Sequence, residues 1–305
     1  MKKYLILDEV FFLLTLAIII FVPKGQVLEI SYIPLIIAVS LVNAVYLLSV
    51  LIGSRKETFD IKTTSIIYAI LFGLFSVWDL TTTVFNVVNP VLFPAPETVF
   101  YVYVDRYEFI LTGVVQSLIK LLVGIALSLV FGTGIGLFIG WVPALRKVFF
   151  PICKVLSPIP PIVYTSYVVA LMPNFQVAAI MVIFLGIFWP TILSTITSVS
   201  NIDRGIIITA KSMGIKDLTM MFKIILPFTL PATIENLTVT VSFSFMTLTS
   251  AEMLGSTAGL GFFVQKYAAF AMYDNVICGI ITIGIVVVFL NMGIELLKKN
   301  VIKWA

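Results

Sequence analysis

Long apolar segments separated by short polar loops follow one another along the whole chain. A helix needs about 20 predominantly apolar residues to cross the hydrocarbon core of a bilayer, and most of the segments reach that length. The pattern gives eight segments: 10–22, 32–52, 64–88, 109–141, 148–172, 177–199, 228–251 and 276–297. We therefore predict an all-α integral membrane protein with about eight transmembrane helices.

The basic residues of the loops predict how these segments are oriented. Lys and Arg gather before the first segment, after the second, fourth and sixth, and after the eighth, whereas each alternate loop carries at most one. Short cytoplasmic loops of membrane proteins carry an excess of Lys and Arg. Both termini are therefore predicted to lie in the cytoplasm, which agrees with an even number of spans.

Composition excludes most classes of enzyme. The chain is 60% hydrophobic and 11% charged, whereas soluble domains have about 45–50% apolar and about 25% charged residues. It has no histidine, which excludes a Ser-His-Asp triad and a His-ligated metal. The net charge of +4 comes from the basic loops and not from a nucleic-acid surface. We expect no catalytic residue, cofactor, metal or nucleic-acid partner.

The polar segment between the sixth and seventh apolar segments carries the most specific pattern. It covers about residues 201–226, and its sequence predicts two short helices that meet at Gly214 on the cytoplasmic face. An elbow of this kind can fit into a socket on a soluble partner.

This segment resembles the coupling loop, or EAA loop, of the permease subunits of binding-protein-dependent ABC importers. That family has an Asp, then Glu-Ala-Ala, then three residues before a Gly, and a closing Leu-Pro pair. The matching residues here are Asp203, Ala210, Gly214, Leu226 and Pro227. Ile208 stands where the family has its glutamate. Residues 92–97, 157–161 and 251–261 resemble other motifs of the family in the same order.

Together these motifs resemble the nitrate, sulfonate and taurine subgroup, over about residues 64–305. The resemblance implies a six-helix permease core over 63–305, preceded by an N-terminal transmembrane hairpin over 1–62. It implies ATP-driven import by alternating access, through the plasma membrane of a prokaryote, of a small solute such as an oxyanion, a sulfonate or a vitamin precursor.

The resemblance also implies partners. They are two copies of a P-loop ATPase subunit, a second permease copy or paralogue, an extracytoplasmic substrate-binding protein and the lipid bilayer. The chain itself has no Gly-x-x-x-x-Gly-Lys-(Ser/Thr) loop. ATP hydrolysis is therefore expected on a separate chain, and this chain is not expected to be an enzyme.

Three groups of candidate residues follow from these motifs. The residues expected to contact the ATPase are Asp203, Ala210, Lys211, Ser212, Met213, Gly214 and Lys216. The residues expected to line the translocation path are Tyr164, Asn236, Thr240, Ser244 and Thr247. The residues expected at an outer gate or binding-protein contact are Glu252, Gly255, Gly259 and Gly261. The path residues are expected there because four of them share one helix face, and polar groups in a bilayer must face protein or water. Hydrogen-bonded packing between helices remains the alternative for them.

Two further patterns concern packing inside the membrane. Asp79 and Lys120 are predicted at similar depth, where an unpaired charge costs about 2.5–3.5 kcal/mol, so we expect them to pair or to share a water-filled pocket. Gly132, Gly136 and Gly140 repeat every four residues, which is typical of close helix–helix contact.

One alternative function belongs to another class. A secondary transporter, or an orphan membrane scaffold, would work without an ATPase. A secondary transporter would need a coupling-ion site near the bilayer midplane, often between inverted repeats. The sequence has no recognisable internal repeat and few charges deep in its spans.

Overall fold

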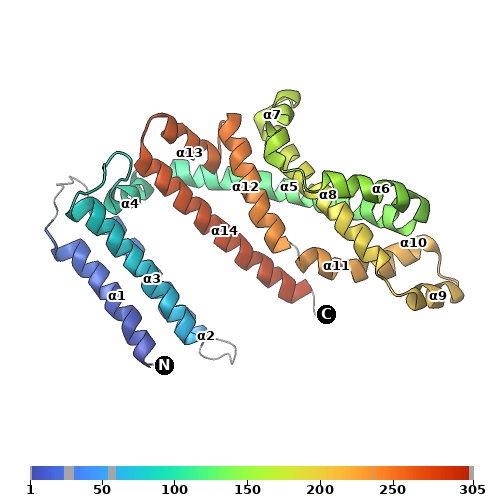
Figure 1. Cartoon of the computed structure of the whole chain (residues 1–305), viewed down its shortest axis with the longest axis horizontal. Helices are drawn as coiled ribbons and strands as arrows, with labels where there is room; N and C mark the ends of the chain where they lie inside the picture. Colours follow the sequence, from blue (N-terminus) through green and yellow to red (C-terminus); the bar gives the residue numbers. More distant parts are fainter. Residues whose placement is uncertain (1, 24–30, 54–59, 236, 302–305) are drawn as a thin grey trace. The chain divides into compact units, whose positions relative to one another are not determined.

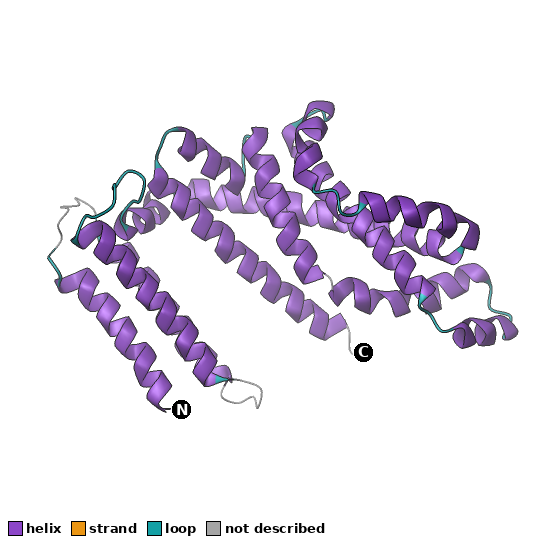
Figure 2. Cartoon of the chain, viewed as in Figure 1, coloured by secondary structure: helices purple, strands orange, loops and turns teal. Residues whose placement is uncertain are grey.

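The protein is described by a computed structural model that covers residues 2–23, 31–53, 60–235 and 237–301. Over these ranges every regular element is a helix, as Figure 2 shows. The predicted all-α class is therefore confirmed. The helices form two compact units, Met1–Ile110 with Val264–Ile280, and Leu111–Phe263 with Ile281–Ala305.

The first unit contains the N-terminal helices. They are α1 (Lys2–Phe21), α2 (Ile33–Gly53), α3 (Ile61–Asp79), the π-helical turn η1 (Leu80–Val84) and α4 (Pro96–Asp105). Helices α1 and α3 lie side by side (Figure 1). Helix α2 packs against both, and α4 packs on α2 and α3.

Hydroxyl pairs join the helices of this unit. The hydroxyls of Thr15 and Ser76 are 2.9 Å apart, and so are those of Tyr46 and Ser65. Such interhelical hydrogen bonds are one of the forces that hold helices together in a membrane. The structure thus groups α3 and α4 with the predicted hairpin, and the division of the chain at residue 62 stays a prediction.

The second unit is built around long helices. It contains α5 (Tyr107–Trp141) from residue 111 onward, α6 (Pro143–Leu156), α7 (Pro161–Leu171) and α8 (Phe175–Ser200). The chain continues through α9 (Arg204–Ser212), α10 (Asp217–Met220), the π-helical turn η2 (Met221–Ile225), α11 (Leu226–Glu235) and α12 (Leu237–Gly255). Helices α13 (Leu260–Ala269) and α14 (Tyr273–Val301) each contribute a part. Helix α8 packs against α6, α7 and α12 (Figure 1).

A row of glycines lets α5 approach α8 closely. A Cβ atom on Gly136 would lie 2.7 Å from the Cβ of Thr195, and one on Gly132 would lie 2.9 Å from the Cβ of Thr191. Gly140 faces Val199 at 2.9 Å in the same way. No real Cβ fits at such distances, so the close packing predicted for these three glycines is confirmed. Small residues are what allow two backbones to pack this tightly.

The fifth predicted span is not one helix. Residues 148–172 fall on α6 and α7, which are bent by 97° across a break at residues 157–160. Pro158, Pro160 and Pro161 cause the break, because proline cannot donate to the helical ladder and disfavours helix in the residue before it.

Fewer helices are long and apolar enough to span a membrane than the eight that the sequence pattern predicts. Five helices in the described ranges are long and apolar enough to cross a membrane, or six if α6 and α7 count as one span. Helix α1 and the pair α11 and α12 account for the difference. The exact number of spans therefore stays a prediction.

Candidate functional site

The segment at 201–226, which we call the elbow, has the predicted two-helix shape. Asp203 begins α9, and its carboxylate accepts the N–H of Gly205 at 2.7 Å as an N-cap. After α9 ends, Gly214 adopts a φ of +74°, and the N–H of Ile215 donates to the carbonyl of Ala210 at 3.2 Å. Glycine in the left-handed region commonly ends a helix.

One side of the elbow is anchored in the second unit. Ala210 is buried in an apolar cluster with Leu137 of α5, Val199 of α8 and Met220 of α10. Movement of α9 therefore cannot occur without a change of packing against α5 and α8.

The exposed surface of the elbow is apolar and basic. Ile208, Met213 and Leu218 are 63%, 74% and 69% exposed. The remaining candidates of this group, Lys211, Ser212 and Lys216, are also exposed. An exposed apolar patch with a polar rim marks a surface for a protein partner or a membrane. The contact role of these residues stays a prediction.

The outer candidate group surrounds a buried ion pair. The carboxylate of Glu252 and the ammonium of Lys120 are 2.9 Å apart, and each side chain is 1% exposed. Ser117 donates to both carboxylate oxygens at 2.8 and 2.9 Å, and the N–H of Gly261 donates at 2.9 Å. Lys120 also donates to the Ser256 hydroxyl at 3.2 Å and to the Ala258 carbonyl at 2.6 Å.

This network corrects one sequence prediction. All three donors of the Lys120 ammonium are engaged within the second unit, so the predicted pairing of Lys120 with Asp79 is wrong. Lys120 was missed as a member of the outer group. Its spacing of three residues from Ser117 puts both on one face of α5, which was the available signal.

The three glycines of the outer group make room for this network. A Cβ on Gly259 would overlap the carboxylate of Glu252, and one on Gly255 would overlap the ring of Phe175. A Cβ on Gly261 would lie 2.5 Å from the carbonyl oxygen of Thr249. Gly259 also has a φ of +131°, which side chains rarely allow. These contacts account for the glycines structurally, and their role in gating stays a prediction.

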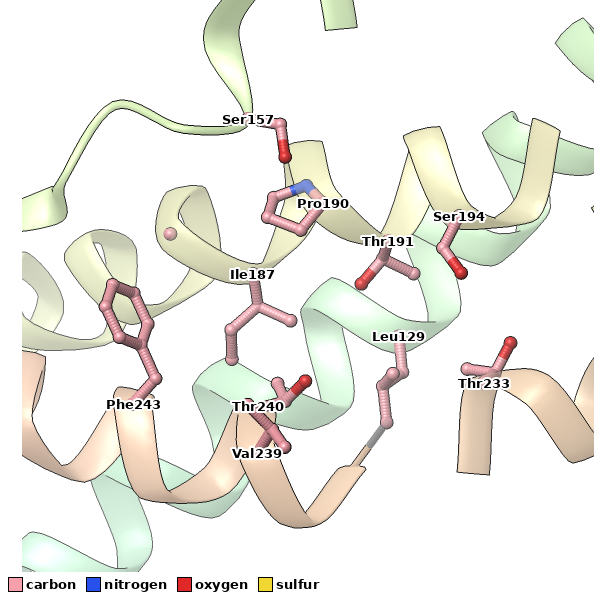
Figure 3. A pocket seen from close by; sticks show the side chains of 11 residues that line it. Leu129, Ser157, Ile187, Pro190, Thr191, Ser194, Thr233, Val239, Thr240 and Phe243 are labelled. Carbon is pink, nitrogen blue, oxygen red and sulfur yellow. The ribbon is translucent and has the colours of Figure 1, made fainter. Parts of the chain in front are cut away.

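A pocket of about 310 Å³ lies in the second unit, shown in Figure 3. Residues of α5, α8, α11 and α12 line it, together with Ser157 at the end of α6. Among the described residues, Thr240 is the predicted path residue that lines this pocket directly. The hydroxyl of Tyr164 lies 3.6 Å from the position that a Cβ would take on the lining residue Gly186, so Tyr164 stands next to the pocket wall.

Two other predicted path residues, Ser244 and Thr247, do not line this pocket. Ser244 and Thr247 are buried, and their hydroxyls donate to the carbonyls of Thr240 at 2.5 Å and Phe243 at 3.0 Å in their own helix. Asn236 lies outside the described residues. The lining hydroxyls that the sequence prediction missed are Ser157, Thr191, Ser194 and Thr233. The run of Ser and Thr after Pro190 in an otherwise apolar segment was a signal for two of them.

Comparison with known proteins gives a family and several relatives. The family described as "Binding-protein-dependent transport system inner membrane component" matches residues 108–304. The taurine transport system permease protein TauC of Escherichia coli (strain K12) is 27% identical over 82% of this chain and 91% of its own length. The nitrate import permease protein NrtB of Leptolyngbya laminosa is 29% identical over 62% of this chain and 68% of its own length.

A solved structure shares the fold. It is the MetNI methionine ABC transporter in inward-facing conformations, and its matched chain superposes with a TM-score of 0.50 at 18% identity. The match covers 65% of this chain and 99% of that one. With a family match over more than half of its length, this chain belongs to the binding-protein-dependent ABC importer permeases, in the nitrate, sulfonate and taurine subgroup, and is a multi-pass inner membrane protein.

Proposed function

We propose that this chain is the membrane-spanning subunit of an ATP-driven importer and forms the translocation path for a small solute by alternating access. Membership of the family implies a separate ATPase and a substrate-binding protein. In the assembly we propose, two permease chains, identical or paralogous, carry two ATPase subunits, and both chain termini lie in the cytoplasm.

The elbow is the observation that carries this proposal. Its outward side is exposed and apolar, while Ala210 on its inner side is buried against Leu137 of α5 and Val199 of α8. The pocket residues Leu129 and Thr191 lie on the same two helices, about two turns before Leu137 and Val199. A displacement of the elbow by an ATPase would thus reach the pocket through two rigid helices.

ATP drives this cycle only if it favours one of two conformations. A ligand shifts a conformational equilibrium by its difference in affinity for the two states. In our proposal the two ATPases close on ATP, pull both elbows and so favour one arrangement of α5 and α8. The network of Lys120 and Glu252 lies at the other end of α12 and would hold the outer loop 256–261 at the gate.

The first experiment is a mild-detergent purification of the tagged full-length chain from its own host, followed by mass spectrometry. We expect a P-loop ATPase to co-purify in near-equal amount, although Ile208 replaces the usual glutamate. Recovery of the chain alone across several detergents would contradict the proposal and favour a transporter or scaffold that works without an ATPase.

A charge in the elbow should disrupt this contact. Met213 is 74% exposed, so Met213→Asp should fold normally, yet it would put an unpaired charge into an apolar interface. We expect at least about tenfold less ATPase to co-purify, which corresponds to a loss of about 1.4 kcal/mol of interface free energy. The matched control is Ala144→Asp, at an exposed position in the first turn of α6, which should keep the ATPase. If both variants retain the ATPase equally, the ATPase does not contact the chain at Met213.

A further inference from the structure

Four hydroxyls of the pocket have unused hydrogen-bonding capacity. Ser and Thr in helices often donate to the carbonyl four residues earlier, as Thr195 and Thr197 of α8 do at 2.8 Å. Within the part of the chain that the structure describes, four lining hydroxyls make no hydrogen bond, and Figure 3 shows their oxygens around the pocket: Ser157, Thr191, Ser194 and Thr240. Each of them can donate and accept.

Pro190 removes one helical donor from the same wall. It lies inside α8 and has no N–H, so the carbonyl of Gly186 has no helical donor four residues later. Gly186 and Pro190 both line the pocket.

The rest of the lining is apolar. Leu129, Ile187 and Val239 contribute aliphatic surface, and the ring of Phe243 is 45% exposed beside them. An exposed ring favours a second flat ring, by stacking or by edge contact. At about 310 Å³ the pocket is at the lower end of the range of about 300–1,000 Å³ for ligand sites, which suits a single ring with small substituents.

Charge is what this pocket lacks. Among its described lining residues none is Lys, Arg, Asp or Glu. Sulfonates and nitrate are permanent anions, and moving an anion out of water without a positive partner is unfavourable. Lys120, the buried lysine among the described residues of this unit, is already neutralised by Glu252.

We propose that the pocket binds an uncharged small molecule whose flat apolar body carries hydrogen-bonding groups, and that it rejects sulfonates and nitrate. The cargo class then differs from those for which the relatives TauC and NrtB are named. This inference rests on the proposed function, because that function makes the pocket part of a translocation path.

Binding to the full-length chain in lipid nanodiscs tests the inference. The uncharged probes are nicotinamide, uracil and benzamide, and the anionic probes are taurine-derived N-acetyltaurine, ethanesulfonate and nitrate. We expect saturable binding of at least one uncharged probe, with no measurable binding of the anions. Failure of every uncharged probe to bind, or tighter binding of an anion, would overturn the inference.

Variants on two helices locate the binding. Thr191→Val and Thr240→Val each remove one pocket hydroxyl. Each should lower the affinity for the uncharged probe about fivefold to tenfold, the usual contribution of one hydrogen bond. The matched controls are Thr197→Val and Thr249→Val on the same helices, whose hydroxyls bond to their own helix outside the pocket, and these should change affinity less than about twofold. Equal effects of the pocket and control variants would place the site elsewhere.

Transport separates this inference from the proposed function. The complete importer is reconstituted in vesicles with its ATPase and binding protein. If ATP drives no uptake while the uncharged probe still binds and responds to Thr191→Val, the proposed function fails and the pocket assignment stands. If ATP drives uptake of an anion that Thr191→Val leaves unchanged, the cargo class is wrong and the importer function stands.

Discussion

Replacing Lys120 by methionine should lower the free energy of unfolding by about 3–5 kcal/mol, the usual cost of removing one partner of a buried ion pair. Glu252 would stay buried with hydrogen bonds from Ser117 and Gly261 but without a positive charge. Glu252→Gln should destabilise by the same mechanism, because it leaves the ammonium unpaired. Denaturant titration in mild detergent measures both changes, with thermal unfolding as a second readout.

The double variant separates electrostatics from packing. The double variant Lys120→Met with Glu252→Gln removes both charges. Its loss of unfolding free energy should be smaller than the sum of the two single losses, because the effects of residues in contact are not additive. Lys266 supplies a control, because it is exposed and lies 4.7 Å over the ring of Phe109. Lys266→Met should cost about 1 kcal/mol at most. Strictly additive losses for Lys120 and Glu252 would contradict the ion-pair account.

The second large effect is expected at the seam between α5 and α8. Gly136→Ala places a methyl group 2.7 Å from the Cβ of Thr195 and 3.2 Å from the carbonyl oxygen of Ile192. The two helices must move apart, and overpacking of this kind costs about 1–3 kcal/mol. Because α5 and α8 both line the pocket and contact the elbow, transport should fall together with stability.

Gly134→Ala is the matched control on the same helix. Nothing lies within 4 Å of its Cβ position, so the added methyl meets no neighbour. Alanine is a better helix former than glycine by about 1 kcal/mol, and this variant should be neutral or slightly stabilised in thermal unfolding. Equal destabilisation at positions 134 and 136 would show that the seam is not the cause.

Hydrophobic pattern and motif spacing were sufficient to predict most of the second unit. The pattern located α5 and α8 to within two residues at each end, because long apolar segments have few alternative structures. Gly214 was identified from the helix signals on both sides of it, and its positive φ follows from the need to end α9. The bend at residues 157–160 was missed because the segment stays mostly apolar across the prolines, with Lys154 and Ser157 as the polar residues before them.

The partners of buried polar groups could not be predicted from one sequence. Similar depth in the membrane suggested Asp79 as the partner of Lys120. In the structure the partner is Glu252, which is 132 positions away in the sequence. Helical periodicity places Thr240, Ser244 and Thr247 on one face. The hydroxyls of Ser244 and Thr247 nevertheless donate to backbone carbonyls of their own helix. Whether a hydroxyl turns to its own helix or to a pocket depends on neighbouring side chains and on the irregularity at Pro190, which the pattern of a single helix does not contain.

The ion pair also has a consequence for how the chain is synthesised. At about 5–20 residues per second, the ribosome needs roughly 7–26 s to make the 132 residues from Lys120 to Glu252. During that time α5 carries an uncompensated lysine, which costs about 2.5–3.5 kcal/mol near the middle of a bilayer. The long apolar sequence of α5 outweighs this cost, so α5 can insert before α12 is made, and the arrival of Glu252 on α12 then removes the penalty. A nascent chain that stops before α12 should therefore hold α5 in the membrane about 2.5–3.5 kcal/mol less stably than a chain that includes α12.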